Sequence, residues 1–364
     1  MNISIPPLPM LPGPVSVPQS VLDAQCFDHG AGRRKAEFLA IHNETAGLLA
    51  EILGTKNNVV IMTGEGMLAL WAALKSPLRA GDKVLCISTG VFGAGMADMA
   101  ASFGCEVATL ELPFNESLRD LGSLEDMIRA FKPKMITAVH CETPSGTINP
   151  LKELGALKKD MGVPLLYVDA VSSAGGMPIN VDECHVDLLL GGSQKCLSAP
   201  PALCFVAVSD AAWEYMEDIN YQGYDALLPF KTMQQTGLYP YTPYWHGVAG
   251  LHKAASLLLE EGLPSVYARH EQAAQQCRQG LARIGIELWP APDAIAAPTV
   301  TAAFVPRTLT WENWYSRLRE RGLGITGSFG PMQNKVFRIG HMGKQANPEH
   351  IKATLAILEN ALNT

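Results

Sequence analysis

The stretch that decides the fold reads LLYVDAVSSAGGMPINVDECHVDLLLGGSQKCLSAP and spans residues 165–200. Two short apolar runs, residues 163–168 and 186–190, have the length and composition of β-strands. The first run ends at Asp169, and the second leads through two glycines to Lys195. Because ligands of open α/β sheets bind beyond the carboxyl ends of the strands, we expect both side chains at a binding edge.

Asp169 and Lys195 are the two groups that pyridoxal chemistry requires from a protein. A carboxylate can hold the protonated ring nitrogen, and a lysine amine can form a Schiff base with the aldehyde. The uncharged neighbours of Lys195 predict a partly buried amine with a lowered pKa, which can attack an aldehyde. The pair by itself leaves a second interpretation open, in which Asp169 caps a helix and Lys195 is a surface lysine on a loop.

Composition argues against several classes of protein. The chain has 364 residues, more than one core usually holds, and two domains are expected. A formal net charge of −7 without a long basic block argues against a nucleic-acid partner. No apolar run reaches membrane-spanning length and the N-terminus does not resemble a signal peptide, so we expect a soluble cytoplasmic protein. The eight cysteines are scattered without a C-x-x-C pair, which favours buried thiols and no metal site.

Strand-like and helix-like runs alternate through the first two thirds of the chain, which predicts an α/β fold. We expect the strand-like runs to form one mainly parallel seven-stranded sheet: residues 58–62, 83–87, 106–110, 135–140, 163–168, 186–190 and 203–208. Apolar residues at helical spacing predict long helices over residues 36–53, 247–261 and 264–284.

The last third of the chain has a different pattern. Strand-like runs at residues 299–305 and 336–339, with a helix-like run between them, predict a small α+β domain. The proline-rich start of the chain predicts an extended arm rather than a helix. We therefore expect a large domain over residues 20–245, with the arm over 1–19 and a small domain over 246–364.

Paired motifs in this chain resemble a known family. VDAVSSAGG around Asp169 and GSQKCLSAPP around Lys195, with those two residues 26 positions apart (195 minus 169), look like the cofactor region of class V aminotransferases of fold type I. TPSGTINP at residues 143–150 and RIGHMG at 338–343 resemble the alanine–glyoxylate branch, and the likeness covers nearly the whole chain. Within that branch the pattern is most similar to the pyridoxamine–pyruvate aminotransferases. The resemblance implies a PLP-transferase fold and a homodimer or homotetramer with active sites shared between subunits.

The resemblance also implies roles for individual residues. Lys195 bears the Schiff base, Asp169 binds the pyridine nitrogen and Arg338 binds the substrate carboxylate. Phe92 stacks on the ring and Thr143 lies near its phenolic oxygen. The other implied contacts to the cofactor are Gly66, Val171 and Gln194, together with Tyr239 and Thr242 from the neighbouring subunit. Two simpler interpretations stay open: Phe92 as an ordinary core residue and Arg338 as a surface ion-pair arginine.

A glycine-rich turn, TGEG at residues 63–66, joins the first strand to a helix. Its free N–H groups favour an anion, and class V enzymes bind the cofactor phosphate at this turn. Glu65 argues against a phosphate, because two such anions side by side repel by several kcal/mol even at an effective dielectric constant of about 20. Glu65 either complements the helix N-terminus and points to solvent, or accepts a hydrogen bond from the hydroxymethyl group of unphosphorylated pyridoxal or pyridoxamine.

The expected activity is amino transfer from pyridoxamine to pyruvate, which yields pyridoxal and L-alanine, as in vitamin B6 degradation. In this hypothesis the vitamin is a bound substrate that leaves after each turnover. The alternative is an alanine–glyoxylate or serine–pyruvate aminotransferase that keeps pyridoxal 5′-phosphate. Phe329 stands where the pyridoxamine–pyruvate pattern has a second arginine, so the keto acid is left open. A class V lyase or desulfurase and a catalytically inactive cofactor-binding scaffold are weaker alternatives.

Overall fold

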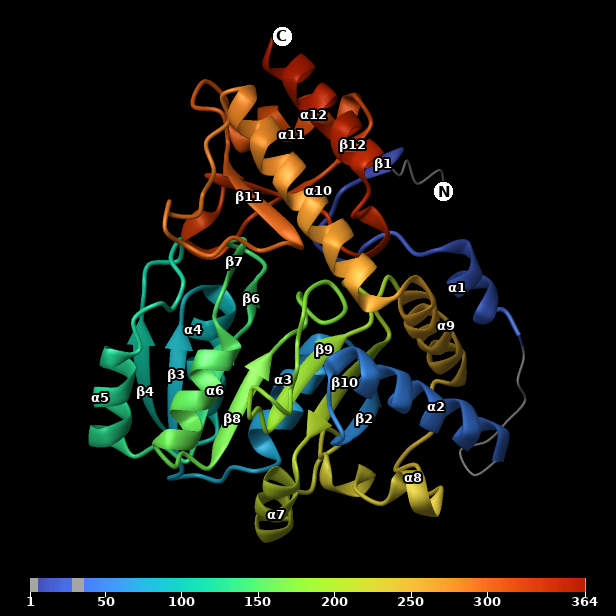
Figure 1. Cartoon of the computed structure of the whole chain (residues 1–364), viewed down its shortest axis with the longest axis vertical. Coiled ribbons are helices and arrows are strands. Elements are labelled where there is room, and N and C mark those ends of the chain that lie inside the picture. The colour runs from blue at the N-terminus through green and yellow to red at the C-terminus, as the bar shows by residue number, and fades with distance from the viewer. Residues whose placement is uncertain (1–5, 28–35, 364) are drawn as a thin grey trace.

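The computed structural model describes residues 6–27 and 36–363, in which a large α/β domain lies beneath a smaller α+β domain (Figure 1). The large domain is built on a seven-stranded sheet with the order β2-β10-β9-β8-β5-β3-β4. β10 runs antiparallel to both of its neighbours, and the other pairs, from β9 to β4, are parallel. The strands are β2 (Asn58–Thr63), β3 (Lys83–Ser88), β4 (Glu106–Glu111), β5 (Met135–Val139), β8 (Leu165–Asp169), β9 (Leu188–Gly192) and β10 (Leu203–Val208). The predicted fold, with its mainly parallel seven-stranded sheet, is confirmed.

The central strands are almost entirely apolar, as expected for strands that helices cover on both faces of the sheet. Every residue of β5, β8 and β9 is buried. Among the packed helices, α3 contacts β9 and β10, and α4 contacts β3 and β4. The helices of the large domain are α2 (Ala36–Leu53), α3 (Gly66–Lys75), α4 (Val91–Ser102), α5 (Gly122–Phe131), α6 (Leu151–Asp160), α7 (Asp210–Ile219) and α8 (Met233–Thr236), with the 3-10 turn η1 (Leu228–Phe230).

One strand lies two residues later in the chain than predicted. β9 includes Gly191 and Gly192, which we expected to form a hinge after the strand. Both glycines pair with β10, and the Phe205 ring covers Gly191 so closely that a Cβ there would lie 2.2 Å from the ring. The glycines are therefore a packing requirement of the strand. β8 likewise extends to Asp169, which pairs with Val139 and Leu190 at the carboxyl edge of the sheet.

The small domain packs three helices against a three-stranded antiparallel sheet, and the fully buried Trp314 and Phe337 belong to its core. The sheet consists of β11 (Val300–Phe304), β14 (Val336–Gly340) and β13 (Thr326–Gly327). The helices are α10 (Leu263–Arg283), α11 (Trp311–Glu320) and α12 (Pro348–Leu362), with the turns η2 (Gly330–Met332) and η3 (Gly343–Gln345). The long helix α9 (Trp245–Glu261) precedes α10 and packs against α2 of the large domain.

The arm at the start of the chain is held mainly by the small domain. β1 (Leu8–Pro9) pairs in parallel with β12 (Leu323–Gly324), and Met10 is fully buried in the core of the small domain. The short helix α1 (Gln19–Ala24) packs on α9, and a small hairpin of β6 (Cys141–Glu142) and β7 (Thr147–Ile148) follows β5. Of the helices described, none is both long and apolar enough to span a bilayer.

Candidate active site

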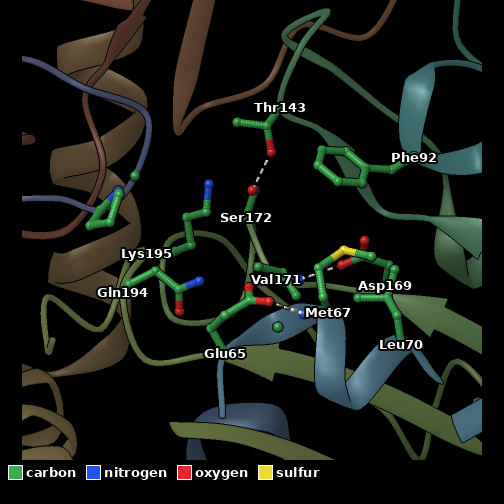
Figure 2. A pocket seen from close by; sticks show the side chains of 13 residues that line it. Glu65, Met67, Leu70, Phe92, Thr143, Asp169, Val171, Ser172, Gln194 and Lys195 are labelled. Carbon is green, nitrogen blue, oxygen red and sulfur yellow. Dashed lines mark hydrogen bonds between the residues drawn. The ribbon is translucent and has the colours of Figure 1, made fainter. Parts of the chain in front are cut away.

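One cavity collects most of the predicted site residues, and it lies at the carboxyl edge of β8 and β9 near the small domain (Figure 2). Asp169 ends β8, Lys195 follows β9, and the first turns of α3 and α4 complete the walls. The lining residues are Gly13, Pro14, Glu65, Gly66, Met67, Leu70, Phe92, Thr143, Asp169, Val171, Ser172, Gln194 and Lys195. The described residues contain no cluster of His, Cys, Asp and Glu side chains that could hold a metal ion.

Asp169 is a carboxyl group kept away from water. Its side chain is 5% exposed, and one oxygen accepts a hydrogen bond of 2.8 Å from the Val171 N–H. Burial raises the pKa of Asp169 to about 6, although the Val171 N–H and the charge of Lys195 partly oppose this shift. A buried carboxylate gains from a cationic partner that donates a hydrogen bond, and a protonated pyridine nitrogen is such a partner. Turns rather than a helix follow Asp169, so the interpretation of this residue as a helix cap is wrong.

Lys195 is half-buried, as predicted, rather than a surface lysine. Burial lowers its pKa to about 8, and the nearby charge of Arg338 lowers it further in the same direction. The Nζ atom donates a hydrogen bond of 2.7 Å to the carbonyl oxygen of Pro12 in the arm. With this pKa, a substantial share of the amine is neutral near physiological pH and can act as a nucleophile or a base.

Phe92 and Val171 give the cavity apolar walls suited to a flat ring (Figure 2). Gln194 contributes a buried Oε1 atom that has no hydrogen-bond partner within the part of the chain described. Thr143 and Ser172 share a hydrogen bond between their hydroxyl groups at the rim. The acid, the amine, the apolar walls and the unpaired acceptor together fit a pyridoxal ring.

Glu65 is the N-cap residue of α3. Its side chain is exposed, and Oε1 accepts a hydrogen bond of 3.1 Å from the Met67 N–H. The carboxylate thus occupies part of the helix N-terminus that would otherwise offer its N–H groups to an anion. Both interpretations of Glu65 agree with this position, because the residue caps the helix and also lines the cavity.

Arg338 lies in β14 and is 7% exposed, so the interpretation as a surface ion-pair arginine is wrong. Its Nε and Nη2 atoms donate to the Gly327 carbonyl oxygen at 3.1 and 2.8 Å. The Phe329 ring lies 4.9 Å from the guanidinium carbon and contacts Phe92 edge-on, with 6.0 Å between the ring centroids. Burial lowers the pKa of Arg338 to about 10, which leaves it a cation at neutral pH. A fixed, poorly hydrated cation is suited to binding a carboxylate.

Three predicted residues do not line the cavity: Arg338, Tyr239 and Thr242. Tyr239 is buried against Phe38 and Phe230, and its hydroxyl donates to the Ile61 carbonyl oxygen at 2.9 Å. Its contact with a cofactor across a subunit interface stays a prediction, since within one chain this hydroxyl bonds to the chain's own strand β2. Thr242 is exposed and away from the cavity, so its contact across a subunit interface stays a prediction.

The sequence reasoning did not single out Glu142, which is fully buried beside the site. Its Oε2 and Oε1 atoms accept hydrogen bonds from the Phe92 and Gly93 N–H groups at 3.2 and 2.8 Å, which fixes the start of α4. Ser172, which also lines the cavity, was not predicted. The resemblance implies that the Pro12-Gly13-Pro14 segment runs over the active-site mouth, but it did not predict the contact of Pro12 and Gly13 with Lys195. The available signal was an acid three positions after the end of an apolar strand, in the sequence AVHCETPSG.

Glu142 should make the stability of the fold depend on pH. Burial raises its pKa to about 8 from 4.5, despite the two N–H donors. The folded chain therefore keeps a proton that the unfolded chain releases, so this stabilisation is complete below pH 4.5 and is lost as pH rises to about 8. Its slope is at most about 1.4 kcal/mol per pH unit. Chemical denaturation at several pH values should show a flatter profile for Glu142→Gln, and parallel profiles for the two chains would contradict this account.

Comparison with known proteins agrees with this site. The family model for class V aminotransferases matches residues 23–336. The chain is 33% identical to a pyridoxamine–pyruvate transaminase of Mesorhizobium japonicum, over 98% of this chain and 92% of that protein. It is 29% identical to an alanine–glyoxylate aminotransferase of Oryctolagus cuniculus, over 96% of this chain and 91% of that protein. The crystal structure of the pyridoxamine–pyruvate aminotransferase from Mesorhizobium loti superposes with a TM-score of 0.95 at 31% identity, covering 100% of this chain and 93% of that one. The chain belongs to the class V aminotransferases and is an aminotransferase.

Proposed function

We propose that this aminotransferase moves the amino group of unphosphorylated pyridoxamine to pyruvate, producing pyridoxal and L-alanine. The observation that carries the proposal is the Glu65 carboxylate, which caps the N-terminus of α3 inside the cavity. A neutral hydroxymethyl group can donate a hydrogen bond to this carboxylate. The vitamin is then a substrate that enters and leaves during each turnover.

Electrostatics argue against the phosphate ester at this position. A phosphate carries nearly two negative charges, and a carboxylate about 4 Å away opposes each of them by about 4 kcal/mol at an effective dielectric constant of about 20. Solvent reduces this repulsion because Glu65 is exposed, but the interaction between the carboxylate and a phosphate stays unfavourable. Glu65 also accepts the hydrogen bond of the Met67 N–H, a donor that a bound phosphate would need.

The residues of the cavity have complementary roles in the proposed reaction. When bound, the ring supplies an electron sink for the carbon that exchanges its proton. Asp169 keeps the ring nitrogen protonated, since the buried carboxylate is stabilised by that N–H. While the ring carries the amino group, Lys195 would be a free amine that moves a proton as base and acid in turn. Its nitrogen would then replace the nitrogen of L-alanine at the aldehyde carbon, and water would release pyridoxal. Arg338 holds the carboxylate of pyruvate or L-alanine.

Removing the guanidinium should weaken binding of the keto acid more than it affects the vitamin. Arg338→Gln should raise the KM for pyruvate about 10- to 100-fold, because a charge-assisted hydrogen bond is worth about 1.5–3 kcal/mol. The Kd for pyridoxal should change by less than about threefold. Arg307→Gln is the matched control, since that arginine is 92% exposed and should leave both constants unchanged. An unaltered KM in Arg338→Gln would remove Arg338 from the carboxylate site.

The second candidate is an alanine–glyoxylate or serine–pyruvate aminotransferase that retains pyridoxal 5′-phosphate. The exposure of Glu65 favours this candidate, because rotation of the side chain toward solvent would free the Met67 N–H for a phosphate. We also infer a homodimer or homotetramer in the cytoplasm, in which Thr242 of one subunit approaches the cavity of another. Light scattering after size-exclusion chromatography measures the subunit number.

A side-by-side assay of the cofactor-stripped protein separates the two candidates. One sample contains pyridoxamine and pyruvate, and the other contains L-alanine, glyoxylate and pyridoxal 5′-phosphate. The proposal expects L-alanine and pyridoxal in the first sample without any phosphate ester. Activity confined to the second sample would overturn it and leave the conventional aminotransferase.

A further inference from the structure

The arm segment, residues 10–16, runs between the two halves of the active site and is bonded to both. On the small-domain side, the Gly340 N–H at the end of β14 donates to the Met10 carbonyl oxygen at 2.8 Å. On the large-domain side, the Val15 N–H donates to the Gln194 carbonyl oxygen at 3.1 Å. The arm segment thus connects the strand that carries Arg338 to the turn that carries Lys195.

In the middle of this segment the arm contacts the Lys195 side chain directly. The Nζ atom donates its 2.7 Å hydrogen bond to the Pro12 carbonyl oxygen. A Cβ atom at Gly13 would lie 2.5 Å from both Nζ and Cδ of Lys195, closer than non-bonded atoms approach. Gly13 also has a φ of +114°, which disfavours other residues. The amine therefore lies in a space that exists because residue 13 has no side chain.

We propose that the Pro12 carbonyl and Gly13 are positioning residues that form a resting site for the free amine of Lys195. The proposal rests on the proposed function, in which, in the direction from L-alanine and pyridoxal, the nitrogen of the donor L-alanine replaces the lysine nitrogen at the aldehyde carbon. The C–N bond to Lys195 breaks as the bond to the donor nitrogen forms, and Lys195 leaves as a free amine. The same state recurs whenever the ring carries the amino group, as it does in bound pyridoxamine.

The resting site gives the freed amine a defined orientation. A neutral lysine amine has two N–H bonds and one lone pair. The Pro12 carbonyl oxygen takes one N–H, so the lone pair and the second N–H stay available to accept and return a proton. Because the arm segment is also bonded to Gly340, it keeps this amine in a fixed relation to the strand that holds Arg338.

A double-mutant cycle on the ligand-free protein tests the contact without requiring activity. Gly13→Ala should lower Tm in the wild-type background, and at least half of that loss should disappear in the Lys195→Ala background, where the colliding atoms are gone. Gly81→Ala is the matched control, because Gly81 has a φ of +86° but open space around its Cβ position. Its loss of Tm should be the same in both backgrounds. An equal loss for Gly13→Ala in both backgrounds would show that only backbone strain is at work and would overturn the proposal.

Ligand affinities provide a second readout that a merely structural role would not produce. In Gly13→Ala, the free-amine states, ligand-free and pyridoxamine-bound, should be destabilised together, whereas the pyridoxal-bound state has vacated the resting site. The ratio of pyridoxal to pyridoxamine affinity should therefore rise about tenfold, since overpacking typically costs 1–3 kcal/mol. Equal weakening of both ligands would overturn the proposal. If the protein binds only the phosphorylated forms, the same ratio is measured with those, so failure of the proposed function is recognised separately.

The wild-type chain offers a test that does not depend on a variant that folds. Hydrogen–deuterium exchange of the arm segment should be faster with saturating pyridoxal than with saturating pyridoxamine, because the Pro12 carbonyl loses its lysine partner only in the first case. Identical exchange with the two ligands would contradict a resting site at Pro12.

Discussion

Lys195→Met should lower kcat for amino transfer at least about 10⁴-fold, because it removes both the nucleophile and the group that moves the proton. Lys195 is a half-buried lysine of the cavity wall, with a pKa lowered to about 8, and methionine keeps most of its volume. Rapid mixing of the variant with pyridoxamine and pyruvate measures the residual rate. Lys344→Met is the matched control, since this exposed lysine lies outside the cavity and should leave kcat unchanged.

The loss should be specific to the chemical step. Lys195→Met should still bind pyridoxamine, because Asp169 and the apolar walls remain, and its thermal stability should stay near that of the wild type. Borohydride reduction in the presence of pyridoxal should attach the ring to the wild-type chain at Lys195 and leave the variant unlabelled. Residual transfer within a factor of about ten of the wild-type rate would show that another group performs the proton transfer.

Glu65→Ser should raise the affinity for pyridoxal 5′-phosphate relative to pyridoxal by about 100-fold, which is below the unscreened repulsion because Glu65 is exposed. The serine keeps an N-cap for α3 and frees the helix N-terminus for the phosphate. Titration of both ligands into the two chains, followed by absorbance, gives the four dissociation constants.

The affinities of the two ligands should change in opposite directions in Glu65→Ser. Pyridoxal should bind more weakly to Glu65→Ser, because its hydroxymethyl group loses a charged acceptor worth about 1.5–3 kcal/mol. Glu51→Ser in the exposed face of α2 is the control for loss of one negative charge and should not change the ratio of affinities. Tight binding of the phosphate ester to the wild type, with no gain in Glu65→Ser, would show that Glu65 does not select against phosphate.

The catalytic pair was predictable because strand periodicity locates strand ends. An acid directly after one buried run and a lysine shortly after the next must meet at one edge of a parallel sheet, and Asp169 and Lys195 do so. The limits of β9 were less predictable, because Gly191 and Gly192 suggest a turn unless the Phe205 ring that covers Gly191 is known. Local sequence does not specify which distant ring packs on a strand.

Contacts between distant segments could not be predicted either, because local sequence does not specify which distant groups meet. Pro12 and Lys195 are 183 positions apart, so their hydrogen bond depends on how the arm passes between the domains. The sequence shows Glu142 as one position of a motif. Its burial and its raised pKa follow from packing against α4. Tyr239 was assigned through resemblance to a shared active site, whereas in the single chain its hydroxyl is bonded to Ile61.

The number of pyridoxal molecules that each chain produces shows whether the vitamin is a substrate or a retained cofactor. Cofactor-stripped protein is incubated with a large excess of pyridoxamine and pyruvate, and free pyridoxal and L-alanine are quantified by chromatography. We expect many equivalents of pyridoxal per chain, with L-alanine formed in equal amount and no phosphate ester present. A yield of one equivalent or less per chain, with turnover restored only by pyridoxal 5′-phosphate and a second amino acid, would contradict this expectation.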